Sequence, residues 1–435
     1  MRIAIVGSGI AGQAAALALH AAGHAVTVYE RETRAGGHAA TVEISYRGTQ
    51  IAVDTGFIVY NTLNYPNLTA FFEWAGVETQ ASSMSFSVSA DNGAFEWCGR
   101  EGKGVLSGLF AQKSNLLSAS YLIMLREILR FQATAKRDRA AASIGPGSLA
   151  DYLRRGGFSK RLQRDYLVPM GAAIWSTSPG AMLEFPAQSF IDFFDNHCLL
   201  QWNRPQWRSV TGGSRAYVAK IQAILAGCVR LATPVTRIRR WPGRVEVSDA
   251  HGDTTAYDHV VLATHARQAL ALLDDASPSE HNLLSPMRTS ANDVVLHCDA
   301  RLMPRRRAAW GAWNFLRSGQ DDATRVAVTY WMNILQGIDP ACPLFISLNP
   351  PFEPAAESVF GRYSYAHPQF DAPALAARAC LGEIQGKNRT WFCGAWTGHG
   401  FHEDGMASGL GVAARLGVAA PWAQSLRPAF RDAAE

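Results

Sequence analysis

The chain has 435 residues, of which 48% are hydrophobic and only 18% charged, a balance that excludes a disordered or collagen-like protein. Lys and Arg number 41 against 36 Asp and Glu, and the resulting net charge of +5 is too small to indicate nucleic-acid binding. Since about 150 residues per domain is usual, we expect a globular protein of two or three domains.

The seven cysteines are scattered and form no Cys-x-x-Cys pair, which argues against a disulfide framework or a metal site and favours a reducing compartment. The sequence contains no run of about 18 apolar residues, the length that a helix needs to span a bilayer. The apolar N-terminus resembles a secretory signal, but Gly7, Gly9 and Gly12 would interrupt its helix, and a strand-like run over 25–30 follows too soon. We therefore expect a cytoplasmic protein.

The N-terminal segment has the order strand, glycine turn, helix, strand. An apolar run over 2–6 predicts a buried parallel strand, the residues G-S-G-I-A-G occupy 7–12, and an Ala- and Leu-rich helix follows over 10–22. This order predicts a Rossmann-like α/β unit that binds a dinucleotide.

Each residue of the glycine turn has a specific role in such a unit. Gly7 would make the turn, Gly9 would let a pyrophosphate contact the backbone, and Gly12 would let helix and strand pack closely. Glu30, at the end of the second strand, would accept a ribose 2′-hydroxyl. An acid at this position indicates FAD or NAD rather than NADP.

The stretch after Glu30 resembles the flavin amine oxidase and phytoene desaturase superfamily, in which a G-G-R-x-x-[ST] motif touches the FAD phosphates and the flavin. Here Gly36-Gly37 are followed by His38, where the family usually has arginine, and then by Thr41. The resemblance implies that the cofactor is FAD. Arg31 or Arg34 would replace the missing phosphate partner.

A second stretch that resembles the superfamily lies over 391–409. In relatives a strand that ends in Gly-Asp precedes a helix beneath the isoalloxazine ring, and here Ala395 replaces that aspartate. The expected helix begins at Gly405, and its unpaired N–H groups would stabilise a reduced, anionic flavin. Glu403 and Asp404 would lie at the flavin or cap this helix.

The resemblance spans the chain and implies a glutathione-reductase-type FAD-binding domain, interleaved with a mixed α+β substrate domain. The expected FAD-binding segments are 1–79, 206–270 and 386–420, the substrate segments, aromatic and strand-rich, are 80–205 and 271–385, and a tail follows over 421–435. A strand meander over 229–264 belongs to the middle FAD segment. The residues expected at the cofactor are Gly7, Gly9, Ile10, Ala11, Gly12, Glu30, Arg31, Gly36, Gly37, His38, Thr41, Gly56, Phe57, Val235, Ala263, Thr264, Gly394, Ala395, Glu403, Asp404, Gly405 and Met406.

Two strings, G-F-H-E-D-G over 400–405 and Y-W-M-N over 330–333, resemble a narrower subgroup. This subgroup comprises bacterial FAD-binding, amine-oxidase-like proteins related to the N-terminal domain of plant cyclopropane fatty acid synthases. The resemblance implies an apolar, acyl-chain substrate and an acyl-modifying enzyme as a partner. Amine oxidases of the superfamily commonly hold a water at flavin N5 with a lysine, but the stretch 293–299 contains none.

Four residues are candidates for catalysis. We expect His297 closest to flavin N5, and His399, His402 and Glu403 could position a substrate or move a proton. The favoured function is a flavin oxidase or desaturase that removes a hydride and a proton from an apolar substrate. A redox-neutral double-bond isomerase of a fatty acid, a flavin amine oxidase and a non-catalytic flavin-binding partner subunit remain alternatives.

A helix expected over 115–134 has apolar residues at helical spacing, with Arg126 and Arg130 off their stripe. Such a helix either packs on its own core or lies on an anionic membrane at the inner face. We expect weak, salt-sensitive membrane association. The apolar stripe comprises Leu117, Tyr121, Met124, Leu125, Ile128 and Phe131.

Overall fold

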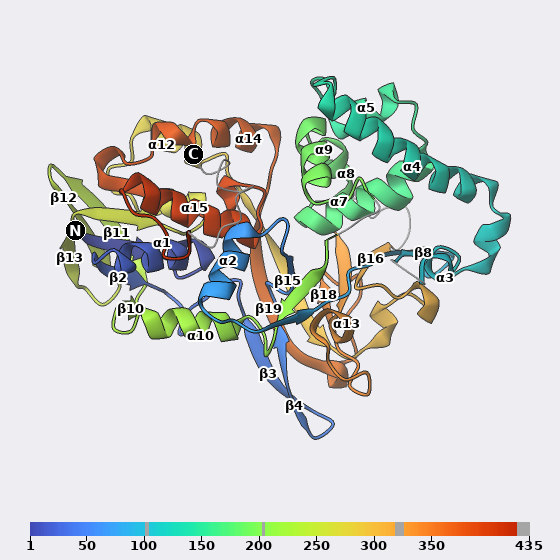
Figure 1. The fold of residues 1–435 in the computed structure, drawn as a ribbon, viewed down its shortest axis with the longest axis horizontal. Coiled ribbons are helices and arrows are strands. Elements are labelled where there is room, and N and C mark those ends of the chain that lie inside the picture. The colour runs from blue at the N-terminus through green and yellow to red at the C-terminus, as the bar shows by residue number, and fades with distance from the viewer. Residues whose placement is uncertain (101–103, 202–204, 318–325, 424–435) are drawn as a thin grey trace.

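A computed structural model describes residues 1–100, 104–201, 205–317 and 326–423. Figure 1 shows two bodies side by side, one formed by both ends and part of the middle of the chain, the other by the segments between them. Of the predicted tail over 421–435, residues 424–435 lie outside the described part. Within these ranges, no helix is both long and apolar enough to cross a membrane.

The first body is built on a five-stranded parallel sheet with the order β10-β2-β1-β14-β20. Its central strand β1 has Ile3, Ala4 and Ile5 fully buried, as a parallel strand covered on both faces requires. The strands are β1 (Arg2–Val6), β2 (Ala25–Tyr29), β10 (Val229–Arg230), β14 (His259–Leu262) and β20 (Thr390–Phe392). The predicted Rossmann-like α/β fold is confirmed.

Helices cover one face of this sheet and an antiparallel meander covers the other. Ile3 and Ile5 pack with α1 (Ile10–Ala21) and α15 (His402–Arg415), whereas Ala4 and Val6 pack with the meander. The meander consists of β11 (Val235–Trp241), β12 (Arg244–Asp249) and β13 (Thr254–Tyr257), which confirms the strands predicted there. The other helices of this body are α2 (Pro66–Trp74), α10 (Arg215–Ile224), α11 (Ala266–Leu272), α12 (Pro278–Leu284) and α14 (Ala372–Ala379).

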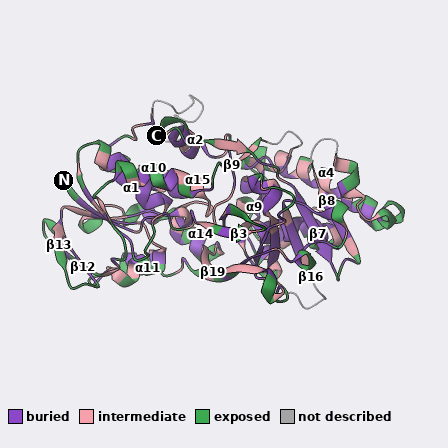
Figure 2. Ribbon diagram, turned by 90° about the horizontal axis from the view of Figure 1, so that it is seen from below, coloured by how far each residue is buried: buried purple, intermediate pink, exposed green. Residues whose placement is uncertain are grey.

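The second body combines a seven-stranded mixed sheet with a helical lobe (Figure 1). The sheet has the order β19 (Val359–Pro368), β15 (Thr289–His297), β18 (Phe345–Leu348), β17 (Ala327–Trp331), β16 (Trp313–Arg317), β7 (Phe86–Ala90) and β8 (Phe95–Gly99). The lobe contains α3 (Val105–Leu109), α4 (Ala119–Ala140), α5 (Leu149–Arg155), α6 (Lys160–Leu162), α7 (Val168–Trp175), α8 (Pro179–Leu183) and α9 (Ala187–Asn196). Buried residues fill the space between these helices and the sheet (Figure 2).

One sequence-based expectation for the lobe is wrong. Residues 105–200 are helical rather than strand-rich, because serines such as Ser118, Ser148 and Ser178 accept backbone N–H groups as N-caps and start helices there. Most of the apolar stripe predicted over 115–134 faces the protein core, since Tyr121, Met124 and Phe131 are fully buried, whereas Leu117 lies before α4 and is 92% exposed. Core packing, one of the two alternatives for this helix, is therefore confirmed for the three buried residues.

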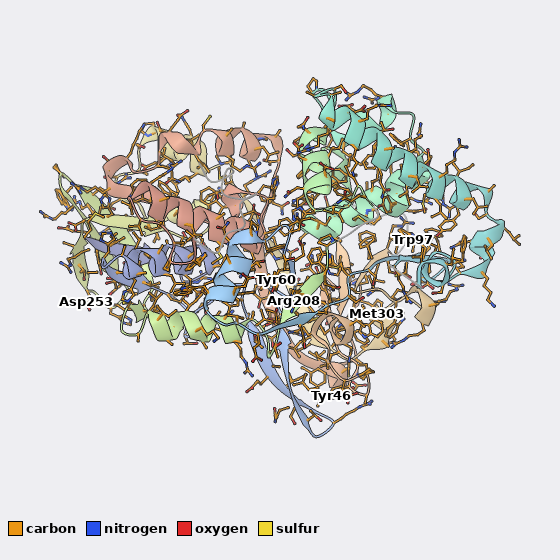
Figure 3. All side chains as sticks on the ribbon, in the orientation of Figure 1. Tyr46, Tyr60, Trp97, Arg208, Asp253 and Met303 are labelled. Atoms are coloured by element: carbon orange, nitrogen blue, oxygen red, sulfur yellow. The ribbon has the colours of Figure 1, made fainter. Side chains whose placement is uncertain are left out.

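Short elements connect the two bodies. The hairpin of β3 (Thr41–Tyr46) and β4 (Thr49–Asp54) extends from the first body along the second (Figure 1), and α13 (Met332–Gln336) follows β17. A small sheet joins β5 (Tyr60–Asn61), β9 (Trp207–Val210) and β6 (Thr79–Ala81). Tyr60 and Arg208, labelled in Figure 3, face each other in this sheet.

Asp54 lies at the junction of the two bodies and is fully buried. Its carboxylate accepts hydrogen bonds from the Thr41 hydroxyl (2.6 Å), from the backbone N–H (2.9 Å) and hydroxyl (2.7 Å) of Ser214, and from the Gln336 amide (2.8 Å). Burial raises the pKa of Asp54 to about 6, against the effect of the hydrogen bonds from Thr41 and Ser214. One carboxylate thus joins the hairpin, the start of α10 and the second body.

Candidate functional site

The turn between β1 and α1 has the geometry of a dinucleotide site. Gly7 has φ of 103°, a conformation that residues with side chains rarely adopt. A Cβ at Gly12 would overlap the carbonyl oxygen of Gly7, so only glycine lets the helix approach the strand this closely. A Cβ at Gly9, in contrast, would meet nothing within 4 Å. The backbone at Gly9 therefore borders open space at a helix N-terminus, where a pyrophosphate fits.

Glu30 is buried directly after β2, beside this turn. One carboxylate oxygen accepts the backbone N–H (2.9 Å) and hydroxyl (2.6 Å) of Ser8, and the other accepts the backbone N–H of Glu32 (3.0 Å). The segment that leads to Val235 lies next to it, since Thr233 donates its N–H to the carbonyl of Glu30 (2.8 Å). These contacts hold the carboxylate where the sequence predicts the ribose.

We expect Glu30→Ala to weaken FAD binding by about 1.5–3 kcal/mol, the usual contribution of a hydrogen bond to a charged group, without changing the reaction of the loaded enzyme. Titration of the apoprotein with FAD measures this change. Glu32→Ala is the matched control, because Glu32 is exposed and its carboxylate pairs with the neighbouring Arg31. Unchanged FAD affinity in Glu30→Ala would show that Glu30 does not contact the ribose.

The loop after Glu30 closes over the glycine turn. Gly36 donates its N–H to the carbonyl of Ser8 (3.1 Å), and a Cβ at Gly37 would lie 3.1 Å from the Cα of Gly9. Arg34 donates to the carbonyls of Gly37 (2.9 Å) and Ala39 (3.2 Å) and so braces the loop. Arg31 is exposed and pairs with Glu32 (2.9 Å). A phosphate contact by either arginine stays a prediction.

His38 lies in this loop among aromatic rings, of which Tyr365 and His367 belong to the second body and His265 precedes α11 of the first. Its ring is 5.1 Å from Tyr365, 5.7 Å from His367 and 6.4 Å from His265. Burial, and then repulsion from the other two histidines, lowers the pKa of His38 to about 3. Its Nε2 is buried and has no hydrogen-bond partner among the described residues. A neutral, unsatisfied imidazole of this kind fits a bound cofactor that completes its hydrogen bonding.

The C-terminal motif packs directly on the N-terminal one. A Cβ at Gly405 would lie 2.7 Å from the side chain of Ile10, and a Cβ at Gly409 would overlap the backbone of Ala11. The helices α1 and α15 therefore need small residues where they cross, and Met406 beside them is fully buried. Two stretches from opposite ends of the chain are thus brought together, as one cofactor site requires.

Helix α15 begins at His402, three residues before the predicted start. The reason is a capping interaction, in which the Phe401 backbone N–H donates to the Asp404 carboxylate (2.8 Å). Asp404 therefore caps α15, which was one of the two roles that the sequence suggested for it. Glu403 caps a different helix, because it accepts the N–H groups of Asn67 (2.8 Å) and Leu68 (3.0 Å) at the start of α2.

Buried rings surround the start of α15. His402 stacks on Phe57 with ring centroids 3.9 Å apart, and its Nε2 is 2.6 Å from the Tyr217 hydroxyl. Burial lowers the pKa of His402 to about 3 and raises the pKa of Glu403 to about 7. His399 is only half-buried, and its ring is 5.8 Å from Phe193 of the helical lobe. The structure therefore groups three of the four catalytic candidates.

His297 lies apart from them, fully buried in the sheet of the second body. Its Nε2 is 2.8 Å from the Ser347 hydroxyl, and its Nδ1 accepts the backbone N–H of Asp299 (3.1 Å). In the same strand, Asn292 pairs with Tyr365. His297 is five residues further along this strand than Asn292. Since a strand rises about 3.3 Å per residue, roughly 17 Å separate His297 from Tyr365 and the other rings around His38. The two hydrogen bonds of the His297 ring connect β15 to β18 and to the loop that follows β15.

Two site residues escaped the sequence analysis. Tyr365 and His367 alternate along β19, so both side chains point to the same face, toward His38. This alternation is the only sequence signal that could have indicated them. The other predicted cofactor residues surround the same region. Thr41 donates a hydrogen bond to Asp54, and Gly394 donates its backbone N–H to the Ser408 hydroxyl. Gly56 lies beside the carbonyl of His38, Ala263 and Thr264 lie beside Gly7, and Ala395 lies beside Gly405.

Comparison with known proteins identifies the family. The family model of flavin-containing amine oxidoreductases matches residues 10–336, well over half of the chain. The chain belongs to this family. It is accordingly a flavoenzyme, an FAD-dependent oxidoreductase, and the open turn at Gly9 together with the unpaired Nε2 of His38 fits that cofactor. A search of curated protein sequences finds no match.

Solved structures show the same fold at low sequence identity. An engineered triple mutant of putrescine oxidase has a TM-score of 0.69 at 15% identity, with 95% of this chain and 98% of that chain covered. A fatty acid isomerase from P. acnes has a TM-score of 0.66 at 16% identity, with 95% and 98% covered. Cyclohexylamine oxidase from Brevibacterium oxydans IH-35A has a TM-score of 0.66 at 16% identity, with 96% and 99% covered.

Proposed function

We propose that this flavoenzyme oxidises an apolar, acyl-chain substrate by removing a hydride and a proton, as an oxidase or a desaturase does. Bound FAD supplies the hydride acceptor. The observation that carries the proposal is the character of the site, which is aromatic and desolvated and in which the described carboxylates of Glu403 and Asp404 are already engaged in helix caps.

Stacked rings connect the start of α15 with the helical lobe. Phe401 stacks on Phe193 with centroids 5.0 Å apart, Phe193 stacks on His197 at 3.8 Å, and Trp175 lies 4.7 Å from Phe193. Burial lowers the pKa of His197 to about 4, so this ring is neutral as well. Such a surface favours an apolar chain and excludes water from it.

The titratable groups of the site are poorly suited to an ammonium ion. Burial lowers the pKa of His38 and His402 to about 3 and that of His367 to about 4, so all three are neutral at pH 7. Both oxygens of Glu403 accept hydrogen bonds at the start of α2, and the Asp404 carboxylate caps α15. No lysine lies among the described residues that form the site. These features support a substrate other than an amine.

His399 is our candidate for the proton acceptor. It is the least enclosed of the grouped candidates, and in the described part of the chain its ring nitrogens enter no hydrogen bond, unlike the ring of His402 and the carboxylate of Glu403. We expect His399→Gln to retain FAD and to lower turnover by a factor of about 10² to 10⁴, the usual contribution of a general base. His297→Gln is the control, since an amide can keep the bond to Ser347. Equal losses in both variants would argue against His399 as the base.

Anaerobic mixing of the holoenzyme with chosen substrates tests the proposal. We expect palmitate, oleate or a phospholipid that carries them to bleach the yellow absorbance of the oxidised flavin, and putrescine and cyclohexylamine to leave it unchanged. Bleaching by the amines alone would indicate an amine oxidase. A double bond that moves along oleate without net consumption of an electron acceptor would indicate an isomerase. No bleaching and no product with any of these lipids would overturn the proposal.

A further inference from the structure

Exposed apolar side chains gather on the outer side of the helical lobe. Leu117 is 92% exposed at the end of the 3-10 turn Lys113–Leu117, and Ile123 is 55% exposed on α4. We call this surface the lobe patch. Its apolar members are Leu116, Leu117, Leu122, Ile123 and Leu129. Large exposed apolar residues that occur singly are normal, but a group of this size marks an interaction site.

The lobe patch includes the face of α4 opposite to the one packed on the core, together with the turn before the helix. Tyr121, Met124 and Phe131 point inward and are fully buried, whereas Leu122, Ile123 and Leu129 point outward. The helix is therefore apolar on two faces over its first three turns. The inward face accounts for the folding of the lobe, and the outward face has no partner within the described chain.

The charged side chains around the patch are positive. Lys113 and Arg126 are exposed, and neither enters an ion pair with a described residue. Arg130 is exposed beside them, 3.5 Å from Glu127. Glu127 is the only acid over 104–136, and it points inward, where it accepts the backbone N–H of Ser159 (3.0 Å). The patch thus combines apolar side chains with cations and has no exposed acid.

We propose that the lobe patch docks the enzyme on an anionic lipid membrane, with α4 parallel to the surface. Leucine and isoleucine side chains would enter the boundary of the acyl region, and Lys113, Arg126 and Arg130 would contact lipid phosphates. A second copy of this chain is a poorer occupant. A twofold interface would place the same cations of two copies against each other.

The lobe that carries the docking surface also borders the candidate active site. Helix α4 packs on α9, and α9 carries Phe193, which stacks on Phe401 next to the flavin motif. Figure 1 shows α4 on the outside of this lobe and α9 on the side toward the first body. Docking is independent of the proposed substrate, because no residue of the lobe patch contacts the residues grouped around α15.

Flotation of the holoenzyme with lipid vesicles tests the proposal. We expect binding to vesicles of equal parts phosphatidylcholine and phosphatidylglycerol at about 0.1 M salt, and loss of binding at about 1 M salt, where the Debye length falls from about 10 to about 3 Å. Leu122→Ser with Ile123→Ser should weaken binding at least about tenfold. Arg126→Glu should weaken it more than roughly fivefold, the usual effect of one charge near an anionic surface.

The controls separate this patch from the general properties of the protein. Phe352→Ser removes another exposed apolar side chain, and Arg237→Glu makes the same charge change on the meander of the first body. We expect both to bind vesicles like the parent protein. Wild-type protein that does not float at low salt would overturn the proposal, as would equal losses in patch and control variants. Self-association that the patch variants abolish, without vesicle binding, would assign the patch to a second copy.

Discussion

Gly9→Val is expected to give a folded but colourless protein. The backbone at Gly9 has φ of −66° and ψ of 177°, which valine adopts without strain, and a Cβ there meets no protein atom within 4 Å. The new side chain therefore extends into the space expected for the pyrophosphate, and its Cβ contacts no other residue. We expect FAD affinity to fall at least about a hundredfold, or about 2.7 kcal/mol, measured by titration of the apoprotein.

Gly12→Val is the informative contrast, since it changes the same motif only three residues away. Its Cβ would overlap the carbonyl oxygen of Gly7 and press on Ala263, so α1 could not pack on the sheet. We expect this variant to unfold or aggregate, whereas circular dichroism and thermal unfolding of the Gly9→Val apoprotein should match the parent apoprotein. A yellow Gly9→Val protein would show that the cofactor does not pass over this turn.

Asp54→Ala should have the largest effect on stability. The substitution leaves Thr41, Ser214 and Gln336 without their common acceptor in a fully buried place. A buried donor that loses its partner costs about 1–3 kcal/mol, so we expect the free energy of unfolding to fall by about 3–5 kcal/mol in denaturant titrations. Asp54→Asn keeps one acceptor oxygen and should lose less.

Asp253→Ala serves as the control for this loss. Asp253 is exposed at the tip of the meander turn (Figure 3), and surface changes of this kind usually alter stability by no more than about 0.5 kcal/mol. If Asp54→Ala proved as stable as Asp253→Ala, the junction between the two bodies would not depend on this carboxylate.

The first body could be predicted well because its constraints are local. Gly7 and Gly12 are required by a turn and a close approach within a few residues of each other, and the apolar runs of β1, β2 and β14 are those of parallel strands covered on both faces. The motif at 400–405 could be related to the first one only by resemblance. The contact between Gly405 and Ile10 depends on the complete fold.

The rest of the site lay beyond local patterns. Tyr365 and His367 belong to a strand of the second body, and no motif accompanies them. Glu403 appeared to belong to its own helix, whereas it caps α2, an element that begins at Pro66. On α4 the sequence shows two apolar faces, and only the packing decides that Tyr121 points inward and Ile123 outward. Such choices are made by tertiary contacts.

The packing of α15 on α1 has a consequence for synthesis of the protein. The glycine turn is translated long before α15, the helix that completes the cofactor site. Until β20 and α15 have been translated, the nascent chain therefore holds an unfinished first body, with its sheet lacking β20 and the apolar side of α1 uncovered. Cofactor loading must follow translation of α15, and any early stop before α15 should yield an apoprotein that cannot mature.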